Sequence, residues 1–200
     1  IKIRRHIHMY PEISEHEYET SKYIKKCLEK IGLEANFIGD TGVVSMLMNN
    51  PEFQTVGLRA EMDALPIEEE TNLEFKSKNK GVMHACSHDG IVATALGVTK
   101  LLYEHKDELK CNVKFIFEPA EEVGRGAKKL IKEKVLENPT VDKMVIFHYA
   151  NSAPIGMEIQ KGVSTATLGR VSIEIIGKSS HWGEPEKGIN AISVAAKVID

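Results

Sequence analysis

The sequence has few cysteines, few aromatic residues and no long apolar run. Its 200 residues include only three cysteines and 6% aromatic residues. An odd number of cysteines at irregular spacing does not make a disulfide framework, so a reducing cytoplasm is the expected compartment. No apolar stretch approaches the roughly 20 residues that cross a bilayer, and no signal-peptide pattern opens the chain. These absences argue against a disulfide-rich secreted protein and against a membrane protein.

An excess of charge of either sign is also missing. The chain has 26 Lys and Arg residues against 29 Asp and Glu residues, which gives a net charge of -3. The two signs are interspersed, so the sequence lacks the basic stripe of a nucleic-acid-binding protein. A hydrophobic content of 42% and a charged content of 28% are ordinary for a soluble globular protein. We therefore expect no nucleic-acid partner and no membrane partner.

Short apolar strands alternate with amphipathic helices in the first 150 residues. The predicted strands are residues 42–48, 55–59, 113–117 and 144–147, and the predicted helices are residues 15–30, 91–104 and 126–135. This alternation predicts an α/β sandwich whose strands are at least partly parallel. Cys27 falls on the apolar stripe of its helix, so we interpret it as a core residue.

A change of pattern near Thr165 predicts a domain boundary. Residues 166–176 alternate like a strand, a turn rich in Gly and Ser follows, and an apolar helix begins at Ile189. We expect residues 1–165 to form one domain and residues 166–200 to be the start of a second. Two hundred residues allow one substantial core and part of another.

Residues 84–90, with the sequence HACSHDG, are the richest candidate for chemistry. Cys86 and His88 stand two residues apart, and on extended or loop backbone such residues project to the same side. They are therefore able to chelate one divalent ion, with Asp89 orienting an imidazole from behind. The alternative is an ordinary buried thiol beside polar loop histidines, and a single Cys-x-His does not decide between the two.

Three carboxylates, those of Glu118, Glu121 and Glu122, follow the strand at 113–117 directly. Open α/β sheets bind their ligands beyond the carboxyl ends of strands. One member of the adjacent pair would bind a metal while the other takes a proton from a metal-bound water. Taken alone, a solvated acidic helix start is the simpler explanation of the same residues.

Two further strand ends carry candidate residues. His148 ends the strand at 144–147, and Asp63 follows the strand at 55–59. Taken alone, His148 is a polar edge residue, and Asp63 either supports a ligand or forms a salt bridge with Arg59. Four strand ends that carry Cys, His, Glu and Asp together nevertheless favour a metal site. Thiolate and imidazole suit zinc, manganese, nickel or cobalt better than calcium or magnesium.

Five motifs in a fixed order extend this interpretation over the chain from Arg4 onward. They are RRHIHMYPEISEHEYET, LRAEMDALPIEEE, GVMHACSHDGIVATALG, FIFEPAEEVGRGAKKLI and GKSSHWGEPEKGINAI. With these motifs the sequence resembles the metallo-aminoacylases, in particular hippurate hydrolase, the plant indole-acetyl-amino-acid hydrolases and N-acetyl-diaminopimelate deacetylase. The resemblance implies a zinc-exopeptidase-like, three-layer α/β catalytic domain with an inserted α+β lid and dimerisation domain.

The same resemblance implies a site and a reaction. It assigns two divalent metal ions, with zinc preferred, to four ligands: Cys86, His88, Glu122 and His148. Glu121 would be the general base, and His181 would reach the partner's active site in a homodimer to stabilise the oxyanion. Without the resemblance, His181 is an exposed turn residue. The implied reaction splits an N-acyl amino acid into a carboxylic acid and a free amino acid.

The chain departs from the family pattern at four positions near this site. Ser87 stands in place of glycine, Ile91 of histidine, Glu61 of aspartate and Glu118 of glutamine. Family members are nearly twice as long and carry a further ligand histidine beyond the lid, so we expect this chain to be part of a longer protein. A dipeptidase or carboxypeptidase of the same clan, or a catalytically impaired metal-binding homologue, remains an alternative.

Overall fold

The computed structural model describes residues 1–150, 156–159 and 171–199. The chain divides into two compact units, Ile1–Ser152 and Ala153–Asp200, and each is described by itself. The domain boundary predicted near Thr165 lies outside the described residues. Among the helices of the described part, none has the length and apolar character needed to cross a membrane.

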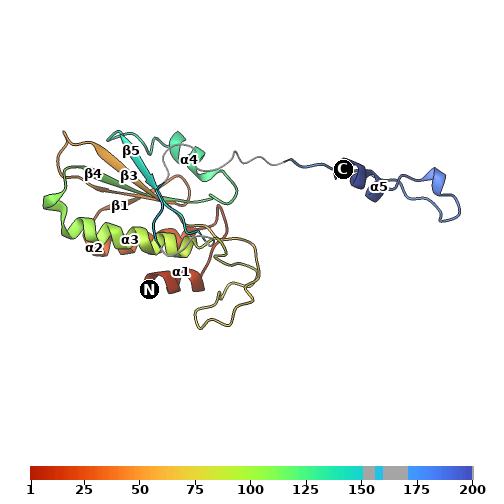
Figure 1. The fold of residues 1–200 in the computed structure, drawn as a ribbon, viewed down its shortest axis with the longest axis horizontal. Helices are drawn as coiled ribbons and strands as arrows, with labels where there is room; N and C mark the ends of the chain where they lie inside the picture. Colours follow the sequence, from red (N-terminus) through yellow and green to blue (C-terminus); the bar gives the residue numbers. More distant parts are fainter. Residues whose placement is uncertain (151–155, 160–170, 200) are drawn as a thin grey trace. The chain divides into compact units, whose positions relative to one another are not determined.

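A five-stranded mixed sheet forms the centre of the first unit (Figure 1). Its strands are β1 (Ala35–Ile38), β2 (Gly42–Leu47), β3 (Thr55–Glu61), β4 (Asn112–Glu118) and β5 (Lys143–Ile146), in the order β1-β2-β4-β3-β5. β3 runs parallel to β4 and β5, whereas β1 and β2 are antiparallel additions. The prediction of a partly parallel sheet is confirmed. Every residue of the central strand β4 is buried, as expected for a strand covered on both faces.

Helices cover both faces of this sheet and make it the middle of three layers (Figure 1). The helices α1 (Lys2–Met9), α2 (Tyr18–Ile31) and α3 (His88–Glu104) pack on one face, with the short helix η1 (Lys106–Glu108) after α3. The helix α4 (Gly126–Lys132) packs on the other face through Leu130. α2 ends at Gly32, whose φ of 105° places it in the left-handed region that glycine adopts readily.

The main core lies between the sheet and the three helices α1, α2 and α3. Ile24 and Leu28 from α2, together with Phe115 and Phe117 from β4, are among its fully buried members. Cys27 is partly buried and packs against the edge of this core, as its place on the apolar stripe predicts. All three cysteines are free thiols.

Several predicted elements have different bounds or surroundings in the structure. α3 begins at His88 rather than at residue 91, and α4 ends at Lys132 rather than at residue 135. The strand predicted at 144–147 is the edge strand β5, which pairs with β3 alone and whose four residues are exposed in this chain. α1 and β1 were not predicted.

The second unit contains η2 (Pro185–Lys187) and α5 (Ala191–Ile199), so the predicted late helix is present. The strand predicted at 166–176 is wrong for residues 171–176, which form no strand, and residues 166–170 lie outside the described part. A strand requires a hydrogen-bonded neighbour, and the one bridge described in this unit joins Lys178 to Ile189.

Truncation of a core residue of α2 should destabilise the first unit. Leu28 is fully buried between α2 and the sheet, so Leu28→Ala should lower the free energy of unfolding by about 2–5 kcal/mol. Leu101, on α3, is 59% exposed, and Leu101→Ala should change it by less than about 0.5 kcal/mol. Urea unfolding of both variants measures the difference. Equal losses would contradict the assignment of this core.

Candidate metal centre

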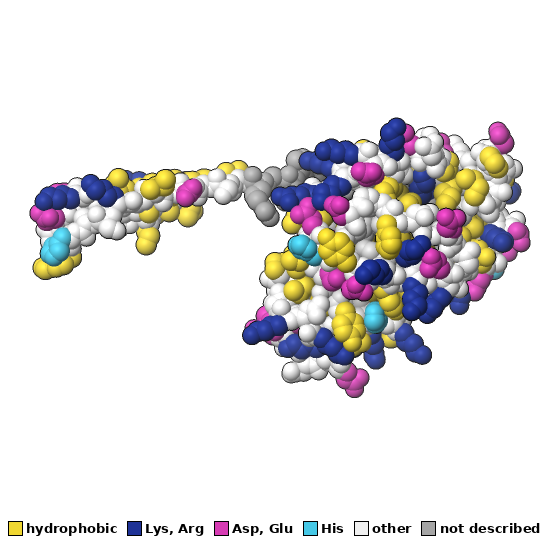
Figure 2. Space-filling model, turned by 180° about the vertical axis from the view of Figure 1, so that it is seen from behind, with side chains coloured by type: hydrophobic (Ala, Val, Ile, Leu, Met, Phe, Trp, Pro, Cys, Tyr) yellow, Lys and Arg dark blue, Asp and Glu magenta, His cyan; other side chains and the backbone are white. Residues whose placement is uncertain are grey.

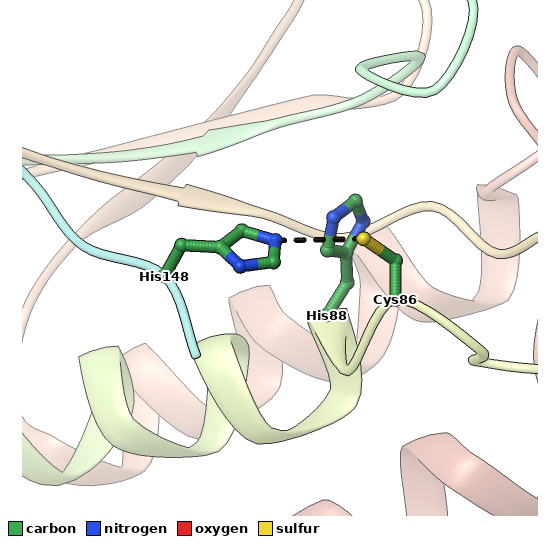
Figure 3. A group of neighbouring side chains, drawn as sticks. All are labelled: Cys86, His88 and His148. Carbon is green, nitrogen blue, oxygen red and sulfur yellow. Dashed lines mark hydrogen bonds between the residues drawn. The ribbon is translucent and has the colours of Figure 1, made fainter. Parts of the chain in front are cut away.

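The parallel pairing of β3 and β4 sets the location of the site. Glu61 and Glu118, the last residues of the two strands, lie opposite each other in the register. The segments that follow, with Asp63 on one and Glu121 and Glu122 on the other, therefore leave the sheet at the same edge. The first turn of α3 and the segment after β5 reach this edge too (Figure 3). The structure thus brings together all five candidate residues of the first unit: Cys86, His88, Glu121, Glu122 and His148.

Cys86 and His88 meet at this edge around a sharp turn of the loop before α3. The backbone between them is not extended, because Ser87 has a φ of 64° and His88 is already the first residue of α3. A left-handed residue turns the chain sharply, which brings the side chains on either side of it to one place. Glycine adopts this conformation freely, whereas for a residue with a Cβ atom the left-handed conformation is less stable by roughly 1–2 kcal/mol. Ser87 therefore replaces the usual glycine at the position where glycine fits best.

Three possible ligands point toward one another in Figure 3. Cys86 Sγ lies 3.5 Å from His148 Nε2, and the ligand atoms of Cys86, His88 and His148 are all within 4.8 Å of one another. A tetrahedral zinc shell with bonds of roughly 2.0–2.3 Å keeps its ligands about 3.3–3.6 Å apart. Cys86 and His148 are therefore already at the spacing that a metal ion requires, and His88 lies within 4.8 Å of both.

Hydrogen bonds fix the direction of both imidazoles. The Nδ1 atom of His88 donates to the carbonyl of Asp63 at 2.9 Å, and that of His148 donates to the carbonyl of Tyr149 at 2.8 Å. Each ring therefore presents Nε2 to the site. His88 Nε2 and Glu122 Oε1 are 3.8 Å apart, and both are buried without a hydrogen-bond partner. Because buried polar atoms are normally paired, a cation between them fits this arrangement.

Asp63 supports the site from behind. Its Oδ1 atom lies 3.3 Å from His88 Nδ1, while Oδ2 accepts the hydroxyl of Ser14 at 2.6 Å and the backbone N–H of Glu122 at 3.0 Å. Burial alone would raise the pKa of Asp63, but the hydrogen bonds from His88 and Ser14 outweigh it and lower the pKa. Asp63 also lies within 4.8 Å of His88 and Glu121, but its Oδ2 atom accepts two hydrogen bonds and its Oδ1 atom faces Nδ1 of His88, so we interpret it as a support rather than a ligand.

The alternative salt bridge between Asp63 and Arg59 is wrong. The guanidinium of Arg59 instead lies between the carboxylates of Glu61 and Glu118. These two glutamates are two of the four departures from the family pattern, and both are buried beside the site. Arg59 binds the two together, so the extra carboxylate of Glu118 is paired rather than free. The fourth departure, Ile91, is fully buried in the main core.

The carboxylates give the site a strongly negative environment. Burial raises the pKa of the Cys86 thiol to about 11, with further contributions from Glu122 and Glu121. Burial likewise raises the pKa of Glu121, although the charges of His88 and Arg59 oppose the change. A thiolate at Cys86 therefore requires a neighbouring cation. A carboxylate with a raised pKa is suited to exchanging protons near neutral pH.

Asp89 does not orient a candidate ligand as predicted. Its Oδ2 atom accepts hydrogen bonds from His8 at 2.9 Å and from Arg4 at 3.0 Å, both on α1. His8 also contacts Glu69 at 3.3 Å, so this buried group joins α1 to the loop before Cys86. The sequence analysis did not identify Arg4 and His8 as partners of Asp89, or Ser14 as a partner of Asp63, although all three lie in the first of the five motifs.

His181 belongs to the second unit and is exposed there. Its Nδ1 atom accepts the backbone N–H of Gly183 at 3.2 Å, within the turn that precedes η2. The neighbouring Trp182 is also exposed. Apolar side chains are at the surface of this unit as well (Figure 2), among them Val171, Ile173, Ile176 and Ile192.

A three-layer α/β domain with Cys, His and Glu gathered at its strand ends is the architecture of the zinc-exopeptidase-like hydrolases. The profile of peptidase family M20/M25/M40 matches residues 57–199. The chain belongs to this family.

Comparison with known proteins agrees with this assignment. The chain is 40% identical over 201 residues to N-acetyl-L-cysteine deacetylase of Bacillus subtilis, covering 100% of this chain and 48% of that protein. It is 43% identical over 203 residues to thermostable carboxypeptidase 1 of Saccharolobus solfataricus, covering 99% of this chain and 51% of that protein. The chain thus spans about half the length of the curated relatives it matches.

A solved structure supports the fold. The Bacillus subtilis YXEP protein, described as a dinuclear metal-binding peptidase of family M20, aligns with a TM-score of 0.73 and 39% sequence identity. The alignment covers 77% of this chain and 43% of that one. The predicted zinc-exopeptidase-like α/β fold is therefore confirmed.

Metal binding at Cys86 should release a proton. With its pKa raised to about 11, the thiol stays protonated at neutral pH, whereas a metal binds the thiolate. Each ion bound by Cys86 should therefore release about one proton near pH 7.5, and the apparent affinity should rise about tenfold per pH unit. Calorimetry in buffers of different ionisation enthalpy measures this release. Cys86→Ala should lower both the affinity and the proton count, and an unchanged count would rule out the thiolate as a ligand.

Proposed function

We propose that the protein carrying this chain is a metal-dependent amidohydrolase that cleaves N-acyl amino acids. The observation that carries the proposal is the pair Glu121 and Glu122 beside His88. One oxygen of Glu122, Oε1, is buried without a hydrogen-bond partner, and the Glu121 carboxylate is more open, at the same 3.8 Å distance from His88 Nε2. A site that only binds a metal has no need of the second carboxylate.

Four residues would hold the metal ions in this proposal: Cys86, His88, Glu122 and His148. When divalent cations are bound, they lower the pKa of water and polarise the amide carbonyl. The thiolate favours zinc, and manganese, nickel and cobalt suit the remaining ligands. The resemblance to two-metal aminoacylases supports two ions in the complete site.

Glu121 would act as the general base. Its side chain is 36% exposed, against 16% for Glu122, so it is open to water and substrate while it faces the same imidazole. It would take a proton from the attacking water and deliver it to the amide nitrogen as the bond breaks. Its raised pKa suits this exchange because the proton must be accepted and then released near neutral pH.

The second unit would complete the enzyme as a lid and dimerisation domain. In this proposal His181 stabilises the oxyanion in the active site of the partner subunit of a homodimer. The resemblance to the metallo-aminoacylases supports both roles for this unit. A small-molecule substrate and a cytoplasmic location are part of the same proposal.

A carboxypeptidase is the second candidate, and the 43% identity to a thermostable carboxypeptidase favours it. A substrate panel separates the two candidates. The intact protein should release amino acids from N-acetyl, N-benzoyl or indole-acetyl amino acids at least about tenfold faster, by kcat/KM, than from dipeptides and peptide C-termini. The opposite preference would assign the protein to the peptidases.

Glu121→Gln should separate catalysis from metal binding. Loss of a general base should lower kcat by about 10²–10⁴-fold while the metal content stays near that of the wild type. Glu122→Gln is the matched control, because it should lower the metal content itself. Turnover of N-acetyl amino acids and elemental analysis of the purified proteins measure the two effects. Full activity of Glu121→Gln would show that another group is the base.

A further inference from the structure

The first motif, which contains Ser14 and Glu17, has no role in the chemistry proposed above. Glu17 is nevertheless fully buried at the start of α2. Its Oε1 atom accepts the backbone N–H of Ala120 at 2.7 Å, across 103 residues of sequence. Its Oε2 atom accepts the hydroxyl of Thr41 at 2.7 Å. A carboxylate from the beginning of the chain is thus bonded to the residue directly before Glu121.

Ala120 lies in a turn that its own sequence does not favour. It has a φ of 52°, the left-handed region that residues with a Cβ atom seldom adopt. Its carbonyl accepts the N–H groups of Arg125 and Gly126, both at 3.1 Å, which closes the turn. A Cβ atom on Gly126 would lie only 1.7 Å from the carbonyl oxygen of Pro119, so the chain passes very close to itself here. Such a turn persists only where its surroundings hold it.

A second buried carboxylate holds the other side of Glu121. The N–H of Glu122 donates to Asp63 Oδ2 at 3.0 Å, and the same oxygen accepts the hydroxyl of Ser14 at 2.6 Å. The backbone N–H groups immediately before and after Glu121 are therefore both bonded to buried carboxylates. Ser14 and Glu17 lie three residues apart in one segment of the chain. Glu17 accepts the N–H of Ala120 directly, and Ser14 donates to the Asp63 oxygen that accepts the N–H of Glu122.

We propose that Glu17 is a positioning residue for Glu121 and that the 14–17 segment sets the direction of the general base. Without the Glu17 carboxylate, the buried N–H of Ala120 has no acceptor, and the left-handed turn relaxes. The Glu121 carboxylate then leaves the place from which it faces His88. The catalytic consequence rests on the proposed function, whereas the effect on the turn does not.

Two substitutions of Glu17 test the role of its acceptor. Glu17→Met removes the acceptor with little change of volume. Glu17→Gln keeps an oxygen for Ala120 and turns its amide nitrogen toward the Thr41 hydroxyl. Ser21→Ala is the matched control, because Ser21 is equally buried on α2 and its hydroxyl bonds the carbonyls of Glu17 and Thr41 without reaching the turn. Thr41→Val is a milder variant that removes only the support of Glu17 Oε2.

Two measurements are made on each variant. Hydrogen exchange of residues 119–124 in the metal-free protein should be at least about tenfold faster in Glu17→Met than in Ser21→Ala. With metal bound, kcat on N-acetyl amino acids should fall about 10- to 100-fold, with KM within about threefold of the wild type. Glu17→Gln should restore both values to within about threefold, and Thr41→Val should show a smaller change in the same direction.

The results separate this proposal from the proposed function. If Glu17→Met and Ser21→Ala show the same exchange at 119–124 and the same kcat, Glu17 is not a positioning residue. If Glu17→Met does not fold, unchanged exchange at 119–124 in Thr41→Val overturns the proposal equally. If the wild type does not cleave N-acyl amino acids, the proposed function fails, and the exchange measurement still decides whether Glu17 holds the turn.

Discussion

The contact between Asp63 and His88 is the interaction on which the rest of the site depends. Asp63 follows β3, His88 opens α3, and the N–H of Glu122 follows β4, so one short acidic side chain and its carbonyl join three segments. The contact fixes the His88 ring with Nε2 toward the other candidate ligands. It also holds the Glu122 backbone in place. Loss of Asp63 would therefore release the His88 imidazole and the Glu122 carboxylate together, whereas loss of one candidate ligand removes only that ligand.

The site gathers more negative charge than its own cations balance. Glu61, Glu118, Glu121, Glu122 and Asp63 lie around one edge of the sheet, and Arg59 pairs with only two of them. Uncompensated buried carboxylates are costly, which is why burial raises the pKa of Glu121 and why the Cys86 thiol keeps its proton. A divalent cation relieves both costs at once. The same environment that makes the metal-free site unfavourable therefore strengthens metal binding, so stability and metal occupancy are coupled.

Sequence patterns predicted the parts of this structure that depend on local periodicity. The strands around 42–48, 55–59 and 113–117 and the helices around 15–30 and 91–104 exist within a few residues of their predicted bounds. The place of β5 beside β3 was not predictable, because the neighbours of a strand are not encoded in its own composition. The strand at 171–176 was wrong for the same reason, since alternation gives a segment two faces but no partner. The ordered motifs indicated the site residues, but only the structure shows their mutual distances.

The segment between Cys86 and His88 shows what residue spacing leaves undetermined. Two ligands separated by one residue can converge on extended backbone or around a left-handed residue, and the serine at 87 favours neither. Glu17 illustrates the same limit over a longer range. A glutamate near a helix start looks like a first-turn charge, which stabilises a helix from the surface. Its burial against Ala120 follows instead from the packing of α2 on the sheet, which carries this carboxylate to the end of β4. Residues of the first motif therefore matter through backbone N–H groups about a hundred residues away, and no local pattern encodes such a contact.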